Sequence, residues 1–258
     1  MNLISAFDIP DSPTPTIAFT GGGGKSSIMY RLASELRTQG QKILVTTTTM
    51  IFHPKIRNRP YDVFFTGSAD AFLKQKSPDK GTITVAGAEI IANGKKIRGF
   101  EPAELKLIQN SGYFDTILVE ADGARGRPIK APAEYEPVIP IGTDIVAGVI
   151  GMDCIGTKIN EQNVHRPGIF TKITDSLFGD IIEEHIVIRL LESPVGIFKN
   201  TSPSTRKIVI FNKSDTEHRI SKAREIAESI SEFTGIERIL ITSMIGNDPV
   251  MAVIAGSI

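Results

Sequence analysis

The chain has 258 residues, of which 41% are apolar, so it is long enough to bury the core of one large α/β domain. Lysine and arginine together number 29, as do aspartate and glutamate, so the basic excess typical of nucleic-acid and membrane-surface proteins is missing. One cysteine, Cys154, excludes an internal disulfide framework, and no stretch contains the roughly 18–20 apolar residues of a membrane helix. We therefore expect a soluble cytoplasmic protein that binds neither nucleic acid nor membranes, with its oligomeric state left open.

The first elements predict a βαβ unit. TIAF, residues 16–19, is a short apolar strand, and four glycines follow it after Thr20. Apolar residues then recur at helical spacing as far as a stop at Gly40, and KILVTTTT, residues 42–49, has the composition of a second strand. Parallel strands need such a crossover, so this order favours a parallel sheet.

The pattern changes between residues 53 and 112. Segments there are short, and Asn93-Gly94 is a hairpin-turn signal between AEII and KIRG. A short helix is expected from Glu101, with proline in its first turn. We interpret residues 53–112 as an inserted β/α subdomain within a single domain that spans residues 1–258.

The α/β pattern returns beyond residue 112. The expected elements are buried strands at 115–122 and 145–152, a mostly helical segment at 176–193, a strand at 207–215, an amphipathic helix at 220–235 and a last strand at 238–244. The whole order predicts an α/β, P-loop NTPase-like fold: a doubly wound, mostly parallel sheet with a small β-rich insertion.

The glycine run has the composition of a phosphate-binding loop. Glycines reach the backbone angles that turn main-chain N–H groups toward an anion, and the start of the following helix favours negative charge. A lysine adds a charge for the β- and γ-phosphates, and a serine hydroxyl is a ligand for Mg²⁺. The nucleotide-binding candidates are Gly21, Gly22, Gly23, Gly24, Lys25, Ser26 and Ser27, with Ser26 as the metal ligand.

The loop follows the pattern T-G-x-x-G-K-[ST] of Mur-type ligases over residues 20–26. The longer pattern G-x-x-x-x-G-K-[ST] needs a glycine where Phe19 stands. A flexible glycine-rich turn with a surface lysine is the alternative. The coincidence of strand, glycine run, Lys-Ser and helix favours the nucleotide site.

Two acids end the strand ILVEAD. Glu120 and Asp122 are two residues apart and face the same side of the strand, so either carboxylate can hold Mg²⁺. Glu120 is the first choice as metal ligand, and Asp122 is the candidate for positioning a water. Thr48, at the end of the second strand, is a further candidate for Mg²⁺ or a γ-phosphate, and Arg125 for neutralising phosphate charge. Each assignment has a simpler alternative. The two acids can end a solvated strand, the threonines can reflect ordinary β-propensity, and Arg125 can be a solvated side chain. The catalytic candidates are Lys25, Glu120, Asp122 and Arg125.

FNKSD places Asn212, Lys213 and Asp215 after an apolar strand, in the N-K-x-D spacing of many GTPases. A carboxylate accepts from both the N1–H and the exocyclic amino group of guanine, a pair of donors that adenine lacks, and a lysine stem covers the base plane. ITSM near Thr242 is a candidate second base loop. These residues favour GTP slightly over ATP, unless Asp215 only caps the next helix.

NVHRP contains Asn163, His165 and Arg166, which are candidates for binding a partner or substrate. Together with TGGGGKSS, LVTTTTMIFHP, VEADGARGRPIKAPAEYEPVIP, GVIGMDCIG and FNKSD, in that order between residues 17 and 215, this motif resembles the YqeC family. The resemblance implies an accessory factor for selenium-dependent molybdenum hydroxylases, acting in cofactor or selenium insertion, with a metalloenzyme as client.

Three functions are compatible with these residues. The first is a Mg²⁺-dependent nucleoside triphosphatase that serves metallocofactor maturation. The second is a small-molecule kinase or ATP-dependent ligase, favoured by the Mur-like loop, and the third is a nucleotide-binding interaction module without turnover. The sequence does not distinguish hydrolysis, transfer and binding alone.

Overall fold

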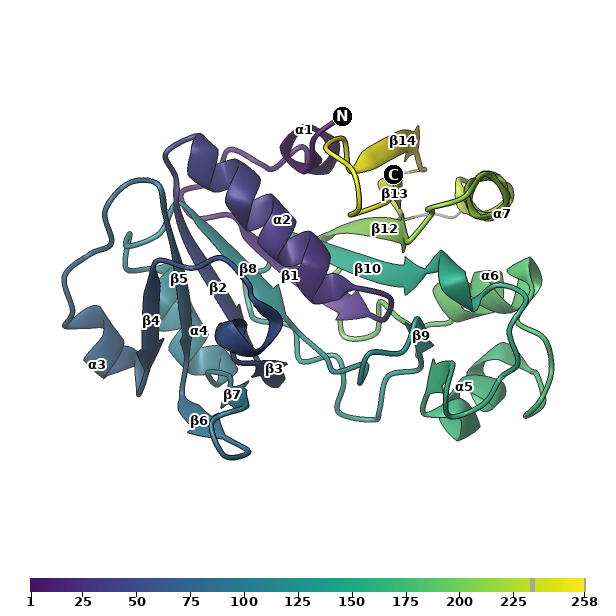
Figure 1. Ribbon diagram of the computed structural model, residues 1–258, viewed down its shortest axis with the longest axis horizontal. Helices are drawn as coiled ribbons and strands as arrows, with labels where there is room; N and C mark the ends of the chain where they lie inside the picture. Colours follow the sequence, from purple (N-terminus) through teal and green to yellow (C-terminus); the bar gives the residue numbers. More distant parts are fainter. Residues whose placement is uncertain (233–234, 258) are drawn as a thin grey trace.

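The computed structural model describes residues 1–232 and 235–257. A nine-stranded sheet, in the order β14-β13-β12-β10-β1-β8-β2-β5-β4, forms the centre of the molecule (Figure 1). Its strands are β1 (Thr16–Gly21), β2 (Lys42–Thr47), β4 (Val63–Thr66), β5 (Thr82–Gly87), β8 (Thr116–Glu120), β10 (Ile145–Gly151), β12 (Arg206–Asn212), β13 (Arg238–Thr242) and β14 (Val250–Ala255). All neighbours are parallel except β13 and β14.

Helices cover both faces of this sheet, because alternate residues of each strand point to opposite sides. Ile17 and Phe19 of β1 share one buried cluster with α1 and α2, whereas Ala18 between them points to the other face. On that other face α3 and α4 pack over β2, β5 and β8, and α6 and α7 pack over β10, β12 and β13. The helices are α1 (Leu3–Phe7), α2 (Lys25–Thr38), α3 (Ala69–Leu73), α4 (Pro102–Gln109), α5 (Pro167–Thr174), α6 (Glu184–Glu192) and α7 (Glu217–Ile230). The expected doubly wound, mostly parallel α/β fold is confirmed.

Residues 53–112, which we expected to form an inserted subdomain, are divided between two sheets. Within them β5 pairs with β2 and β4 pairs with β5, so both extend the main sheet. A separate antiparallel sheet consists of β3 (Met50–Phe52), β7 (Lys96–Arg98) and β6 (Glu89–Ile91). Asn93 and Gly94, both with positive φ, turn the chain between β6 and β7. This small sheet also includes β3, which precedes residue 53.

Several element boundaries differ from the expected ones. The helical segment expected at 176–193 is helical only from Glu184, where α6 begins, and the helix expected at 220–235 is α7, which ends at Ile230. Residues 233–234 of that expected helix lie outside the described residues. The strand at 238–244 is not the last one, because β14 returns antiparallel beside β13 and buries Val250 in the core.

The carboxyl ends of the parallel strands meet along one edge of the sheet. Phe19 of β1 lies beside Glu120 of β8, and Thr47 of β2 lies on the other side of Glu120. On the opposite flank of β1, the ends of β10 and β12 are brought level by the pairing of Gly151 with Asn212. Loops at such an edge are the usual place for a ligand site in a doubly wound sheet. In the part of the chain that the structure describes, no helix has both the length and the apolar composition to cross a membrane.

Candidate functional site

The four glycines form a tight turn between β1 and α2 that is packed on the neighbouring loops. Gly21, Gly23 and Gly24 have positive φ, at 87°, 78° and 115°. A Cβ atom on Gly23 would lie 2.0 Å from the amide nitrogen of Gly151, and one on Gly22 would lie 2.8 Å from the carbonyl oxygen of Arg127. Only glycine fits this backbone conformation and these approaches. The glycine run is therefore required by the packing of the loop as well as by its turns.

The main-chain amides of this turn fall into two groups. Gly22 donates to the carbonyl of Val149 at 2.8 Å, and Gly23 donates to that of Arg127 at 3.0 Å. The amides of Gly24, Lys25 and Ser26 at the start of α2 have no hydrogen-bond acceptor among residues 1–232 and 235–257. Free amides at the start of a 14-residue helix, added to its dipole, make a site that favours an anion.

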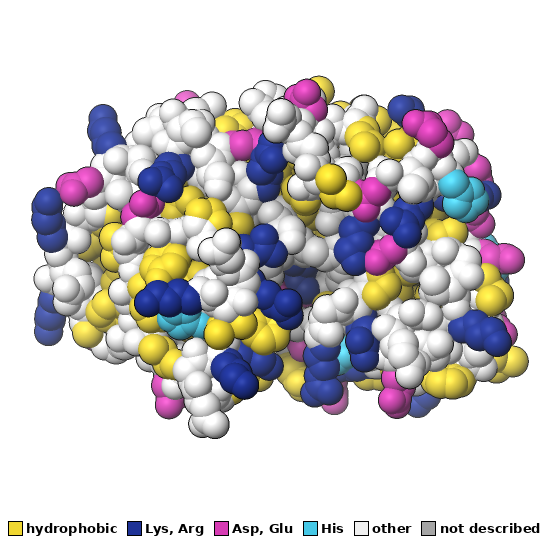
Figure 2. Space-filling view, in the orientation of Figure 1, with side chains coloured by type: hydrophobic (Ala, Val, Ile, Leu, Met, Phe, Trp, Pro, Cys, Tyr) yellow, Lys and Arg dark blue, Asp and Glu magenta, His cyan; other side chains and the backbone are white. Residues whose placement is uncertain are grey.

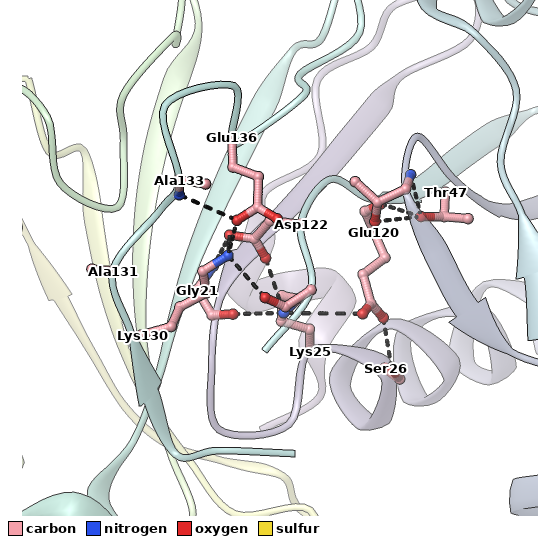
Figure 3. A network of polar contacts seen from close by, with 12 residues as sticks. Gly21, Lys25, Ser26, Thr47, Glu120, Asp122, Lys130, Ala131, Ala133 and Glu136 are labelled. Carbon is pink, nitrogen blue, oxygen red and sulfur yellow. Dashed lines mark hydrogen bonds and ion pairs between the residues drawn. The ribbon is translucent and has the colours of Figure 1, made fainter. Parts of the chain in front are cut away.

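Lys25 is buried under this turn. Its ammonium group donates to the carbonyl of Gly21 at 2.5 Å and lies 3.0 Å from the Asp122 carboxylate and 4.0 Å from that of Glu120 (Figure 3). Burial by itself lowers the pKa of Lys25, but the carboxylates of Asp122 and Glu120 outweigh it and raise the pKa above its ordinary value. The lysine is therefore a charged group that is held inside the loop by two acids.

Ser26 and Glu120 meet as the sequence predicted for a metal pair. The Ser26 hydroxyl donates to the Glu120 carboxylate at 2.6 Å. Burial raises the pKa of Glu120, against the opposing effects of Lys25 and of the Ser26 hydrogen bond. Among the described residues, no three His, Cys, Asp or Glu side chains converge as metal ligands. One serine and one acid suit Mg²⁺, which keeps several waters and takes its other ligands from phosphates.

The threonines at the end of β2 and in the turn after it donate to main-chain carbonyls. The Thr47 hydroxyl donates to the carbonyl of Glu120 at 2.6 Å, and the Thr48 hydroxyl donates to that of Val138 at 2.6 Å. Thr47 therefore fixes the strand end that carries Glu120. A Thr48 hydroxyl in this position contacts the chain after β8 rather than Ser26, although its oxygen keeps lone pairs for a ligand.

Asp122 is the first member of a chain of buried ion pairs. It accepts from the Gly21 amide at 2.9 Å and lies 3.1 Å from the Lys130 ammonium, which is 2.5 Å from Glu136. Glu136 in turn binds the Arg166 guanidinium through two bonds, at 2.6 and 3.0 Å. Burial opposes ionisation of Glu136, but Arg166 and Lys130 prevail and lower its pKa to about 2. The chain of alternating charges runs from the glycine loop to the start of α5.

Sequence reasoning missed this chain of ion pairs, although two of its motifs signalled it. The segments RPIKAP and NVHRP pair as the short parallel strands β9 (Ile129–Lys130) and β11 (Val164–His165). Glu136 comes from the AEYEP segment, which no spacing rule connects to Arg166 thirty positions away.

Asn163 donates to the carbonyl of Lys158 at 2.9 Å, and burial beside Arg166 and Lys130 lowers the pKa of His165 to about 4.

Arg125 lies apart from these contacts. Its side chain is exposed and its backbone has a φ of 49°. Nearby, Arg127 is engaged with the carbonyl of Glu161 at 2.6 Å. In the space-filling view, lysine and arginine side chains gather around a hollow near the middle of the face (Figure 2). The basic groups of the loop after β8 thus comprise the buried Lys130, which pairs with acids, the half-buried Arg127, which bonds to a carbonyl, and the exposed Arg125.

The N-K-x-D segment meets the glycine loop from the β12 side. Asn212 donates to the carbonyl of Gly23 at 2.8 Å, and its own amide oxygen accepts from Thr242 at 3.1 Å. Lys213, with a φ of 59°, pairs with Asp153 at 2.7 Å. Asn212 therefore connects the glycine loop to the ends of β12 and β13.

Asp215 accepts from the Ser243 hydroxyl at 2.5 Å and lies 3.7 Å from the Arg219 guanidinium. The next helix, α7, is capped by Thr216, whose side chain accepts from the Arg219 amide. The alternative in which Asp215 serves only as this cap is therefore wrong. The ITSM segment supplies Ser243, the serine that donates to the Asp215 carboxylate.

Comparison with known proteins assigns the chain to a family. The family model described as YqeC protein matches residues 17–168, more than half of the chain. This protein belongs to the YqeC family. An Escherichia coli (strain K12) relative described as "Uncharacterized protein YqeC" is 33% identical over 218 residues, which cover 84% of this chain and 83% of the relative.

The family model matches the glycine-loop side of the site, and the N-K-x-D segment lies outside the matched range. Residues 17–168 include the glycine loop, Glu120, Asp122 and the ion-pair chain as far as Arg166. Asn212 and Asp215 lie outside that range. The YqeC match therefore coincides with the loop, the acids and the buried ion pairs.

Proposed function

We propose that this protein binds a nucleoside triphosphate with Mg²⁺ and hydrolyses it. The observation that carries this proposal is the start of α2, where the amides of Gly24, Lys25 and Ser26 have no acceptor among the described residues. A buried lysine and a serine–carboxylate pair lie beside these amides. Amides, a lysine charge and a metal pair are the three parts that a triphosphate site needs.

Each residue of the loop and of the strand end has its own role in binding the triphosphate and Mg²⁺. Lys25 exchanges its bond to the Gly21 carbonyl for phosphate oxygens, while Asp122 keeps the ammonium near its position. Ser26 supplies a ligand to Mg²⁺, and Glu120 holds the ion through water or directly. When bound, the ion neutralises charge on the β- and γ-phosphates.

The acidic side chains beside Lys25 have different tasks. Asp122 already accepts from the Gly21 amide and faces two ammonium groups, so its first task is to hold the loop and Lys25. Glu120 contacts Ser26 and is left to hold the ion, directly or through a water. Arg125 is exposed, and in the kinase or ligase alternative it would bind an acidic acceptor.

The base in this proposal is guanine. The Ser243 hydroxyl holds one Asp215 oxygen, and Lys213 lies along the neighbouring loop, paired with Asp153. A carboxylate oriented in this way can accept from both guanine donors. For a client we propose a metalloenzyme under maturation, as the family resemblance implies, with the triphosphate ordering loops that the client binds.

The test is a calorimetric panel of GTP, ATP and CTP with Mg²⁺, followed by phosphate-release assays with and without EDTA. We expect GTP to bind most tightly and phosphate release to need Mg²⁺ but no acceptor. Ser26→Ala should reduce release about 100-fold or more, and Ser34→Ala, on the same helix with its hydroxyl bonded to the Tyr30 carbonyl, should leave it unchanged. Release only with an added acceptor would replace hydrolysis by transfer, and binding without release would leave an interaction module.

A further inference from the structure

Arg59 reaches the start of α2 from a segment that no motif singled out. Its guanidinium donates to the Ser27 hydroxyl at 2.8 Å and lies 5.7 Å from the centre of the Tyr30 ring. Ser27 is the neighbour of Ser26, the serine that meets Glu120. The arginine thus contacts the same first turn of α2 that presents the free amides.

The local sequence directs Arg59 toward this helix. The short 3-10 helix η1 (Pro54–Arg57) follows β3 and is capped by the His53 side chain. Asn58 ends it in the left-handed conformation, with a φ of 48°, and the Arg59 amide then bonds to the carbonyl of Pro54 at 2.9 Å. Pro60 disfavours a helical conformation for the residue before it, so no helix resumes at Arg59.

The Arg59 guanidinium has no carboxylate partner among the described residues. This is unusual for a half-buried charged side chain. Its Nε atom is buried without a hydrogen-bond partner in the part of the chain that the structure describes, and the side chain is half-buried. Burial lowers the pKa of Arg59, despite the opposing influence of Tyr30. Four other basic groups around the loop have acidic partners, namely Lys25, Lys130, Arg166 and Lys213, whereas Arg127 donates to a main-chain carbonyl.

A half-buried guanidinium with spare donors beside free helix amides is suited to a phosphate. Arginine presents five N–H donors in a rigid planar arrangement that matches two oxygens of a phosphate group. Only one of those donors, the one to Ser27, has a partner among the described residues. The arrangement leaves Arg59 with a positive charge and with donors that have no acceptor among the described residues, in contact with the residue that follows Ser26.

We propose that Arg59 is the arginine that contacts the transferring phosphate, an inference that rests on the proposed function. In hydrolysis the water oxygen forms a bond to the γ-phosphorus while the bond to the β–γ bridging oxygen breaks. The bridging oxygen keeps the electron pair, and the proton from water passes to the released phosphate. Arg59 stabilises the negative charge on the oxygens around the γ-phosphorus, a task that the sequence analysis assigned to the exposed Arg125.

The experiment compares Arg59→Ala, Arg59→Gln and Arg57→Ala by single-turnover hydrolysis and by calorimetric binding of Mg²⁺ with GTP. Arg57 is the matched control, because it lies two positions away with its guanidinium over the Phe52 ring at 4.7 Å. Loss of an arginine that acts in the transition state costs about 10³-fold or more in rate. We expect that loss in both Arg59 variants, with affinity for GTP changed less than about 10-fold and Arg57→Ala unchanged. Gln keeps a donor for Ser27, so it separates loss of charge from loss of that contact.

A second readout uses GDP with Mg²⁺ and aluminium fluoride, which imitates the transferring phosphate. The wild-type protein should bind this complex, and Arg59→Ala should not. Hydrolysis that persists within about 10-fold in both Arg59 variants, or a loss that appears in Arg57→Ala as well, would overturn the assignment. A wild-type protein that neither binds nor hydrolyses any Mg²⁺ nucleotide would instead remove the proposed function, and the task of Arg59 with it.

Discussion

The two sides of the candidate site differ in how their charges are held. Around the glycine loop, Lys25, Asp122, Lys130 and Glu136 are each at most 4% exposed, and each charge meets one of opposite sign. In the N-K-x-D segment, the Lys213 side chain is 36% exposed and that of Asp215 is 24% exposed. The first side is part of the core, so a substitution there changes both folding and binding. The Lys213 and Asp215 side chains are nearer to solvent, so a substitution of either reports mainly on a ligand, whereas Asn212 and Ser243 beside them are buried.

The largest expected effect on nucleotide affinity is on the loop side. Lys25→Ala should weaken binding of Mg²⁺ with GTP at least about 100-fold, because charge-assisted hydrogen bonds to phosphate are lost. Asp122 still has Lys130 as a partner, so the variant should fold. Calorimetry measures the affinity, and Lys172→Ala, an exposed lysine of α5, is the control. A folded Lys25→Ala protein with wild-type affinity would show that the loop does not bind phosphate.

Glu136→Gln tests whether the buried ion pairs belong to the core. It leaves Arg166 without its carboxylate and Lys130 with Asp122 alone, so the free energy of unfolding should fall by about 3–5 kcal/mol. Urea denaturation at neutral pH measures the change. Glu89→Gln, which breaks the exposed pair with Arg98, is the control and should cost less than about 1 kcal/mol.

The difference in unfolding free energy between wild type and Glu136→Gln also depends on pH. The sign of that dependence follows from the pKa of Glu136. That pKa is about 2 in the folded protein and has an ordinary value of 4.5, so ionised Glu136 stabilises the fold above about pH 4.5. The stabilisation should be lost as pH falls from about 4.5 to 2. The difference in unfolding free energy between wild type and Glu136→Gln should therefore shrink in that window. A difference that stays constant down to pH 2 would contradict the assignment.

Asp215→Ala tests the other side with a smaller effect. GTP affinity should fall by about 10-fold or more, because two hydrogen bonds to a charged acceptor are lost, while ATP affinity should change less than about 3-fold. Calorimetry with both nucleotides measures the ratio. Glu217→Ala, an exposed acid at the start of α7, should change neither. An equal loss for both nucleotides would remove the preference for guanine from the proposal.

The smallest effect is expected from Ser243→Ala. The Ser243 hydroxyl donates to Asp215, so its loss frees the carboxylate to rotate and should weaken GTP binding by about 3- to 10-fold. Unfolding midpoints should change little, because the Asp215 carboxylate that loses the bond is 24% exposed and can be solvated instead. Ser229→Ala, on α7 with its hydroxyl bonded to the Glu225 carbonyl, is the matched control. An unchanged GTP affinity would mean that Asp215 needs no support from the loop after β13.

The local motifs were readable from the sequence because their atoms are close along the chain. Strand, glycines, lysine, serine and helix follow one another within residues 16–40, so the turn and the free amides of Lys25 and Ser26 follow from the order of residue types. The meeting of Ser26 with Glu120 was also predictable, because parallel strands end at a common edge. The YqeC membership rests on a much longer stretch, residues 17–168, that includes this loop.

Contacts between distant segments were decided by tertiary structure alone. Periodicity indicated that residues 53–112 form short elements, but not that β5 lies beside β2 in the main sheet. No local pattern connects Glu136 to Arg166 or Arg59 to Ser27, which are separated by 30 and 32 positions. A sequence pattern reports which face of an element is apolar, whereas the partner of a charge depends on how loops pack after the elements have assembled. The sequence by itself thus determined the α/β sheet and its glycine loop, and the packed loops decided which charges lie beside that loop.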